Sequence, residues 1–298
     1  MGKLPTIDRV LVVGDIMRDT IVIPKGAMVH GSDVRAKISQ HNGGSAANQS
    51  LWLSKNNVPV KFLARVAQDD LSHYQNHFEK KDITPVFIGD KNLPTGHLVT
   101  LVDENGERSF FTDRGANINL CLDDIEKNIF DDISLLHLSA YAFFETSPRK
   151  VALKLIEQAR QKNIPFSIDP ASFSFLRQVG VKQFLVWTKG AAMFFPNEEE
   201  AALLAGSQNL EEQIKQLSYN YDLVVIKQGA NGSVAGNKDG IITSAKAKKI
   251  KAVDSTGAGD AFFGGFIGAI KGGENLHDCL IQGNHFGALA TTKLGGQP

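Results

Sequence analysis

Short apolar runs alternate with amphipathic segments along most of the chain. The runs are rich in β-branched and aromatic residues, and they predict buried strands at 9–13, 60–66, 134–138, 165–169, 192–195 and 223–227. Apolar residues at helical spacing predict helices at about 45–56, 69–80, 147–163, 197–206, 209–219, 257–271 and 275–292. This alternation predicts an α/β three-layer sandwich, in which a mainly parallel central sheet carries helices on both faces. In such a sheet, ligands bind at the carboxyl ends of the strands.

Two regions interrupt this alternation. Residues 19–41 alternate apolar and polar positions among Pro and Gly, and residues 96–114 predict a hairpin that turns at Glu104-Asn105-Gly106. Together they predict a small antiparallel sheet, formed by about 16–42 and 96–114, that stands off the main domain. The sheet is either surface decoration or a lid that excludes water from a polar site. We favour the lid, because both segments leave the core on the side where ligands bind.

Composition narrows the class of protein. The 298 residues are 42% hydrophobic, which fits a single domain over 1–298 with a sizeable core. Lys+Arg and Asp+Glu both number 32, so we expect neither a nucleic-acid nor a membrane partner. The two cysteines lie far apart and predict reduced thiols in a cytoplasmic protein, and the first residues, MGKLPTIDRV, hold no apolar signal region. The basic run Lys246–Lys251 is interpreted as the solvated face of a strand.

One stretch near the C-terminus, AVDSTGAGDAFFGGF at 252–266, combines a polar glycine-rich turn with an apolar helix. We interpret Val253 and the residues before it as a strand end, and Gly257-Ala258-Gly259-Asp260 as the first turn of the helix. The first amides of a helix lack intrahelical partners and favour anions. Glycines let another group approach that backbone closely. The turn therefore predicts an anion site.

Two acids accompany this site. An acid at a helix start, such as Asp260, is often only a favourable cap, but that reading leaves Asp254, six residues earlier, unexplained. A carboxylate beside an anion site is the arrangement that phosphoryl transfer needs, because it can accept the proton of the attacking hydroxyl. The pattern is neither a Walker A loop nor a dinucleotide fingerprint.

With a second motif, Gly43-Gly44-Ser45-Ala46-Ala47-Asn48, about 200 residues before Asp254-Ser255-Thr256-Gly257-Ala258-Gly259-Asp260, the chain resembles the ribokinase-like (PfkB) carbohydrate kinases over essentially its whole length. The resemblance implies a single ribokinase-like kinase domain that uses ATP and Mg²⁺. It implies that Asp260 is the catalytic base and that the amides of Gly257, Ala258, Gly259 and Asp260 hold the γ-phosphate. Asp254 and the carbonyl of Thr256 match positions that help to bind an activating monovalent cation such as K⁺; Asp254 could instead be a turn former.

The resemblance also implies an acceptor site. Gly43 and Gly44 would approach the sugar with their backbone, and Asn48 would both donate to and accept from a hydroxyl. Asp19 matches a sugar-binding Asp that follows the first strand, where a carboxylate can accept from two vicinal hydroxyls. An exposed turn Asp is the alternative interpretation of Asp19.

A nucleotide site is implied by three further segments. Asn197 and Glu200 match the family's N-x-x-E, which organises Mg²⁺ through water, and they also fit a capping box. Lys227, Gly229 and Gly232 match a nucleotide-side loop, in which Lys227 replaces a smaller polar residue. Asn284 matches a position that lines the adenine pocket, although an ordinary helix-surface Asn would fit as well.

Departures from the family leave the acceptor open. Met17 stands where ribokinases carry a sugar-binding Asn, Ser45 replaces a Lys, and Ser139-Ala140-Tyr141 stands where some members place a Glu. Arg108 and Arg114, in the predicted hairpin and its exit, could reach an acidic or phosphorylated sugar.

The sequence therefore favours an ATP-dependent kinase that phosphorylates a hydroxyl of a small sugar, as ribokinases and fructokinases do. One alternative is a nucleoside kinase of the same family, for which Phe110, Phe111 and Tyr141 are candidate stacking residues. Another is a non-catalytic regulator that binds a sugar or nucleotide. Lid sheets of this family often pair between subunits, so a homodimer through the lid is a further hypothesis.

Overall fold

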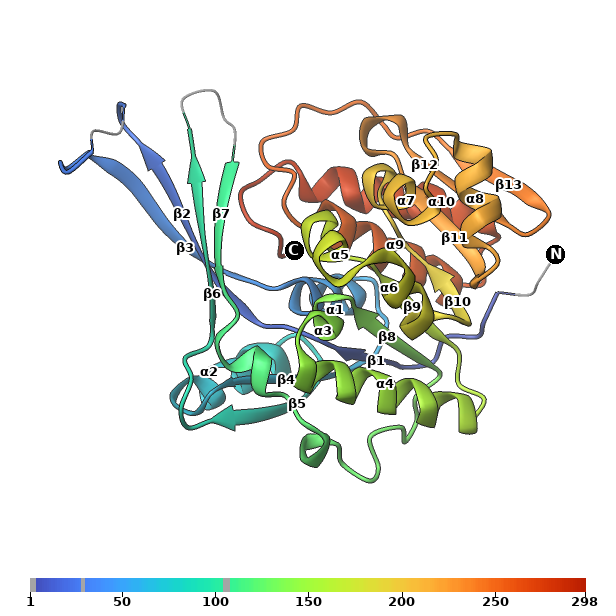
Figure 1. Cartoon of the computed structure of the whole chain (residues 1–298), viewed down its shortest axis with the longest axis horizontal. Helices are drawn as coiled ribbons and strands as arrows, with labels where there is room; N and C mark the ends of the chain where they lie inside the picture. Colours follow the sequence, from blue (N-terminus) through green and yellow to red (C-terminus); the bar gives the residue numbers. More distant parts are fainter. Residues whose placement is uncertain (1–3, 28–29, 104–107) are drawn as a thin grey trace.

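The computed structural model describes residues 4–27, 30–103 and 108–298. Its main body is a nine-stranded sheet between two layers of helices (Figure 1). In spatial order the strands are β13 (Gly240–Ala245), β12 (Ser233–Asn237), β11 (Tyr221–Lys227), β10 (Ala191–Phe194), β9 (Phe166–Asp169), β8 (Leu135–Ser139), β1 (Val10–Val13), β4 (Val60–Ala67) and β5 (Ile83–Asp90). The strands from β11 to β5 are parallel, while β12 and β13 are antiparallel. All six predicted strands are confirmed, and β5, β12 and β13 were not predicted.

Helices cover both faces of this sheet. One face carries α1 (Ser45–Lys55), α2 (Leu71–Glu79), α9 (Ala258–Lys271) and α10 (Leu276–Ala290). The other carries α3 (Tyr141–Phe144), α4 (Thr146–Gln161), α5 (Phe173–Val179), α6 (Val181–Thr188), α7 (Glu198–Ala205) and α8 (Leu210–Leu217). Strand β1 shows how the two cores arise, because Val10 and Val12 pack on the first layer while Leu11 and Val13 pack on the second. The seven predicted helices are confirmed, and α3, α5 and α6 were not predicted.

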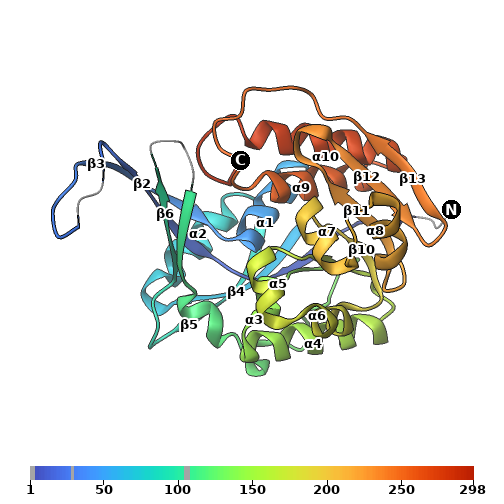
Figure 2. The same cartoon turned by 45° about the horizontal axis from the view of Figure 1, so that its top comes forward.

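A second, four-stranded sheet stands off the main body (Figures 1 and 2). Its strands, in spatial order, are β3 (Ala36–Gly43), β2 (Met17–Pro24), β6 (Gly96–Val102) and β7 (Arg108–Asp113). The outer pairs are antiparallel, but β2 and β6 run parallel, since β2 follows β1 and β6 follows β5 out of the same edge of the parallel sheet. The predicted turn at Glu104-Asn105-Gly106 lies outside the described residues.

The segment that leads from β13 to α9 differs from the prediction. Strand β13 ends at Ala245, and residues 246–257 belong to no strand, so the interpretations of Lys246–Lys251 as a strand face and of Val253 as a strand end are wrong. The chain has to cross from the edge of the sheet to a helix that packs over its face. It is held there by α10, since the backbone amides of Val253 and Asp254 donate to the carbonyl of Thr291 (N···O distances of 2.7 and 3.1 Å).

Short 3₁₀ turns complete the described chain, at Gln68–Asp70, Gly115–Asn119, Leu122–Asp124 and Gly229–Asn231. Within the ranges that the structure describes, no helix has both the length and the apolar character needed to cross a membrane.

Candidate active site

One cavity of about 1110 Å³ collects most of the predicted functional residues. Its wall is formed by the small sheet, by the carboxyl ends of β9 and β11, and by the first turns of α1 and α9. This location agrees with the rule that ligands bind at the carboxyl edge of a parallel sheet. The two glycine-rich motifs, about 200 residues apart, therefore meet at one site.

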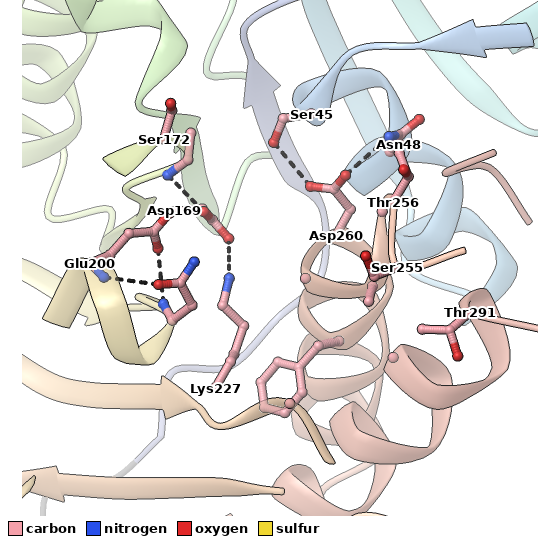
Figure 3. A pocket seen from close by; sticks show the side chains of 18 of the residues that line it. Ser45, Asn48, Asp169, Ser172, Glu200, Lys227, Ser255, Thr256, Asp260 and Thr291 are labelled. Carbon is pink, nitrogen blue, oxygen red and sulfur yellow. Dashed lines mark hydrogen bonds and ion pairs between the residues drawn. The ribbon is translucent and has the colours of Figure 1, made fainter. Parts of the chain in front are cut away.

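Asp260 lies in the first turn of α9 and points at α1 (Figure 3). Its carboxylate accepts hydrogen bonds from Ser45 Oγ at 2.9 Å and from Asn48 Nδ2 at 3.0 Å. A glycine allows the two helices to approach this closely, because a Cβ at Gly264 would lie 2.6 Å from the Cβ of Trp52. Ser45, which the sequence marked only as a departure, is thus a direct partner of the predicted base.

The surroundings of Asp260 make it a stronger base than an ordinary Asp. Burial and the negative charge of Asp169 raise its pKa to about 8, against the opposing effect of Asn48, Ser45 and Lys227. A carboxylate with a pKa in this range is well matched to accepting a proton from a hydroxyl near neutral pH.

The turn before α9 is built around glycine and Asp254. Gly257 has a φ of 75°, and a Cβ there would lie 2.4 Å from the Cα of Gly296. Asp254 is 2% exposed, and its two oxygens accept the backbone amides of Thr256 at 2.7 Å and Gly295 at 3.0 Å. Asp254 therefore fastens the turn to the C-terminal segment, which agrees with its interpretation as a turn former; whether it also serves a cation stays a prediction.

Lys227, at the end of β11, contributes a cation beside the same helix turn (Figure 3). Its Nζ lies 2.8 Å from Asp169 Oδ2, and 3.1 Å from where a Cβ of Gly259 would stand. Burial alone would lower the pKa of Lys227, but the carboxylates of Asp169, Glu200 and Asp260 outweigh that effect and raise it. The amine thus stays protonated next to the first turn of α9.

Asn197 and Glu200 form the predicted capping box at the start of α7. Asn197 Oδ1 accepts the amide of Glu200 at 2.8 Å, and Glu200 Oε2 accepts the amide of Asn197 at 2.9 Å. Glu200 is 2% exposed, and burial raises its pKa to about 7 in spite of the nearby Lys227. In the part of the chain that is described, no three His, Cys, Asp or Glu side chains gather into a metal cage. Carboxylates at the cavity without a full cage fit Mg²⁺, which keeps several waters and phosphate ligands.

The acceptor end of the cavity is lined by β2 and α1. Asp19 is 8% exposed within β2, so the alternative interpretation as an exposed turn residue is wrong. A Cβ at Gly43 would lie 2.2 Å from Asp19 Oδ2, which explains why glycine stands there. Burial and the charges of Asp15 and Asp254 raise the pKa of Asp19 to about 7. Among the described residues, Asp19 Oδ1 and Asn48 Oδ1 are buried acceptors without a hydrogen-bond donor, as a ligand with hydroxyl groups would require.

The nucleotide end holds the remaining predicted residues. Gly229, Gly232 and Asn284 all line the cavity. Gly232 has a φ of 106°, and a Cβ there would lie 2.0 Å from the carbonyl oxygen of Ala245. Asn284 is 8% exposed and donates from Nδ2 to that same carbonyl at 2.9 Å, so it is not an ordinary helix-surface residue.

Two residues at the site were missed by the sequence. Asp169 and Asp15 were not predicted, although Asp169 closes a predicted strand and Asp15 follows the first one. Both positions could have been found by applying the carboxyl-edge rule to every strand. Gly44 has a φ of 99°, and a Cβ there would lie 2.6 Å from the backbone oxygen of Asp15, so the first motif packs directly on the loop after β1.

Comparisons with known proteins agree with this geometry. The sequence model of the pfkB family of carbohydrate kinases matches residues 7–298. The chain is 25% identical to a 5-dehydro-2-deoxygluconokinase from Clostridium perfringens, over 92% of this chain and 88% of that protein. A ribokinase from Thermotoga maritima superposes with a TM-score of 0.80 at 27% identity, over 98% of this chain and 95% of the ribokinase. An E. coli protein described provisionally as ribokinase II, in a structure with ATP and Mg²⁺, superposes with a TM-score of 0.86 at 20% identity, over 97% and 94% of the two chains.

Proposed function

Because the chain belongs to the pfkB family of carbohydrate kinases, we propose that it transfers the γ-phosphoryl group of ATP to a hydroxyl of a small sugar. The observation that carries the proposal is the position of Asp260. Its carboxylate, part-buried and with a raised pKa, lies in the first turn of α9, inside the cavity that also holds Asp19 and Asn48. In this turn the amides of Gly257, Gly259 and Asp260 have no hydrogen-bond acceptor among the described residues, so they can bind an anion.

In this proposal the chain prepares the acceptor hydroxyl. Asp19 and Asn48 orient the sugar through their unpaired oxygens, and Asp260 takes the proton of the attacking hydroxyl. Ser45 holds one oxygen of Asp260 and Asn48 holds the other, so the carboxylate keeps one orientation beside the acceptor. The amides of Gly257, Ala258, Gly259 and Asp260 stabilise the negative charge of the phosphoryl group in transfer.

The same proposal assigns the nucleotide end. Lys227, Gly229, Gly232 and Asn284 would bind ATP, and Asn197 and Glu200 would organise Mg²⁺ through water. When bound, Mg²⁺ neutralises charge on the phosphates. Asp254 and the carbonyl of Thr256 would serve K⁺; faster turnover in K⁺ than in Na⁺ salts supports that role, and equal turnover contradicts it.

We further propose that the small sheet is a lid. Leu98, Phe110 and Thr112 lie on its cavity side, where they would exclude water from the transferred phosphoryl group. We expect the reaction to occur in the cytoplasm, where ATP is supplied.

The opposite side of the small sheet suggests a homodimer. By strand register, Val22, Ile38, Val99, Leu101 and Phe111 share this side, and Ile38 and Phe111 are 63% and 62% exposed. An apolar patch of this kind favours association with a second copy. Ile38→Ser should shift the mass measured by light scattering from dimer to monomer, and an unchanged mass would remove the proposal.

Two alternatives stay open. A nucleoside kinase would use Phe110, which is 56% exposed at the cavity, as a stacking residue, whereas Phe111 faces away and Tyr141 is already covered by Arg114. A non-catalytic regulator would bind ligands without turnover, but it has no need for an acid placed as Asp260 is.

The deciding experiment is a phosphorylation screen. The protein is incubated with ATP, Mg²⁺ and ribose, fructose, keto-deoxy sugar acids, sugar phosphates or nucleosides, and ADP release is compared with that of Asp260→Asn. ADP release with a sugar, lost in the variant, supports the proposal. Turnover of nucleosides alone would select the nucleoside kinase. Ligand binding without any turnover would select the regulator.

A further inference from the structure

Three side chains at the acceptor end have no part in the phosphoryl transfer proposed above. Asp15 follows β1, Arg114 follows β7, and Tyr141 begins α3, so segments far apart in the sequence meet at this point of the cavity wall. Their side chains form one cluster on this wall.

Arg114 is the centre of this cluster. Its Nη1 lies 3.0 Å from Asp15 Oδ2, and its guanidinium lies over the Tyr141 ring, 4.6 Å from the ring centroid. Asp15 is itself fixed, since its Oδ1 accepts the amide of Ala46 at 3.2 Å. The side chains of Arg114 and Asp15 are 15% and 3% exposed. The guanidinium is thus held along one edge and on one face, in a single orientation.

The rest of the guanidinium is available to a ligand. Arg114 lines the cavity, and its Nε and Nη2 make no hydrogen bond to any of the described residues. A guanidinium carries five N–H donors in a planar fork, and the free donors of such a fork match the oxygens of a carboxylate or a phosphate.

The position of this fork sets it apart from the nucleotide site. Two other cations line the described cavity: Lys227, which lies against the first turn of α9, and Lys248, three residues after β13, whose last carbonyl accepts from Asn284. Both belong to the phosphate and adenine side. Arg114 lies instead beside Asp15, Met17 and Tyr141, and it lines the same cavity as Asp260. One acceptor in this cavity can therefore contact both Arg114 and the base.

We propose that the acceptor carries an anionic oxygen group, a carboxylate or a phosphate, which Arg114 binds at the end remote from the phosphorylated hydroxyl. The inference rests on the proposed kinase function and narrows it from small sugars to sugar acids or sugar phosphates. Asp15 and Tyr141 are positioning residues, because they hold the guanidinium and leave its outer edge to the ligand.

The test compares anionic with neutral acceptors. D-Gluconate and 2-keto-3-deoxy-D-gluconate supply the carboxylate, fructose 6-phosphate supplies the phosphate, and D-fructose and D-ribose are the neutral set. We expect the highest kcat/KM with one anionic set, and which set it is distinguishes the two sources. In Arg114→Met the ratio of kcat/KM for that anionic acceptor to kcat/KM for D-fructose should fall by about 10²-fold, because the charge-assisted pair is lost. Arg114→Lys, which keeps the charge but not the fork, should recover part of the ratio.

Two variants control for structure. Arg18→Met removes an arginine that pairs with Asp70 on the far side of β2, and should leave the ratio unchanged. Arg114→Met alone leaves the carboxylate of Asp15 without its partner and could fail to fold for that reason. The double variant Arg114→Met/Asp15→Asn leaves no unpaired carboxylate in the cluster, so it provides the same test if the single variant does not fold. Calorimetry of the anionic acceptor with Asp260→Asn gives a readout independent of turnover, and Arg114→Met in that background should abolish the binding.

The outcomes separate the inference from the function. If the protein prefers neutral sugars, or if Arg114→Met lowers neutral and anionic turnover equally, the inference about Arg114 is wrong and the kinase function stands. If no acceptor of either set is phosphorylated and none binds, both are overturned.

Discussion

The two acids of one glycine-rich turn, Asp254 and Asp260, lie six residues apart but accept hydrogen bonds from different kinds of donor. Asp254 accepts hydrogen bonds from two backbone amides and joins two segments of chain. Asp260 accepts hydrogen bonds from two side chains of α1 and lies on the cavity. Backbone amides are fixed by the fold, whereas the hydroxyl of Ser45 and the amide of Asn48 can turn as the carboxylate changes charge.

The difference separates an acid that supports structure from one suited to chemistry. The pKa of Asp260 is raised to about 8, so the folded protein binds this proton more tightly than the unfolded chain does. As the pH rises from about 4 to about 8, the folded state loses stability relative to the unfolded chain, because a carboxylate that is partly shielded from water has to ionise. The ionised form of Asp260 therefore lowers the stability of the folded state, whereas we expect Asp254 to increase it.

The largest predicted effect follows from replacing the base. Asp260→Asn should lower kcat by ~10²–10⁴ while the protein still binds ATP, because general base catalysis is lost and the helix turn remains. The same variant should have a higher Tm than the native chain at pH 8, and this gain should shrink toward pH 5, where the native carboxyl is protonated. Steady-state kinetics and calorimetry at both pH values measure the two effects.

Asp278 offers a matched control for this variant. It lies in the first turn of α10, outside the cavity, where its amide donates to Asn275. Asp278→Asn should leave kcat within a few-fold of the native value. Native-like turnover by Asp260→Asn would remove the base assignment, and with it the comparison between the two acids.

The second effect concerns the cation that faces the base. Lys227→Met should lower kcat/KM for ATP by ~10², since the positive charge beside the α9 amides would no longer stabilise the phosphoryl group. The substitution leaves Asp169 without its partner, so the double variant Lys227→Met/Asp169→Asn is measured alongside. If the double variant recovers full activity, Lys227 serves only to neutralise Asp169.

Replacing the structural acid should have a smaller effect, and on a different quantity. Asp254→Asn keeps one acceptor oxygen but turns an amide N–H toward one of the two backbone donors, so the free energy of unfolding should fall by about 1–3 kcal/mol. The loss is read from urea unfolding. The kcat of this variant should fall less than that of Asp260→Asn; a loss of activity with unchanged stability would instead favour a catalytic or cation-binding role for Asp254.

Sequence patterns predicted the strands and helix starts around this site well, because these elements depend on residues close together in the chain. The buried strands β1 and β11 are short apolar runs, and the capping box at Asn197 follows from spacing alone. The start of α9 was found because glycines and an acid before an apolar helix indicate free amides. These features need no knowledge of what lies across the molecule.

Contacts across the molecule could not be predicted in the same way. Ser45 was seen as a departure, because its bond to Asp260 depends on how closely α1 and α9 pack. Lys246–Lys251 was assigned to a strand because charge alternation does not reveal that β13 ends at Ala245. Asp169 was missed because its importance comes from Lys227, which lies 58 residues away in the chain.

The smallest predicted effect tests directly whether a side chain of α1 changes the pKa of Asp260. The Ser45 hydrogen bond stabilises the ionised form of Asp260 and so lowers its pKa. In Ser45→Ala that pKa should rise, and because the base acts when ionised, the acid limb of the pH profile of kcat/KM should move to higher pH by about one unit. Ser50→Ala is the matched control, since Ser50 lies in the same helix and donates to the carbonyl of Ala46 instead. A limb that stays in place in Ser45→Ala, or moves equally in Ser50→Ala, would mean that side chains of α1 do not tune the base, and that Asp260 differs from Asp254 only in its exposure to the cavity.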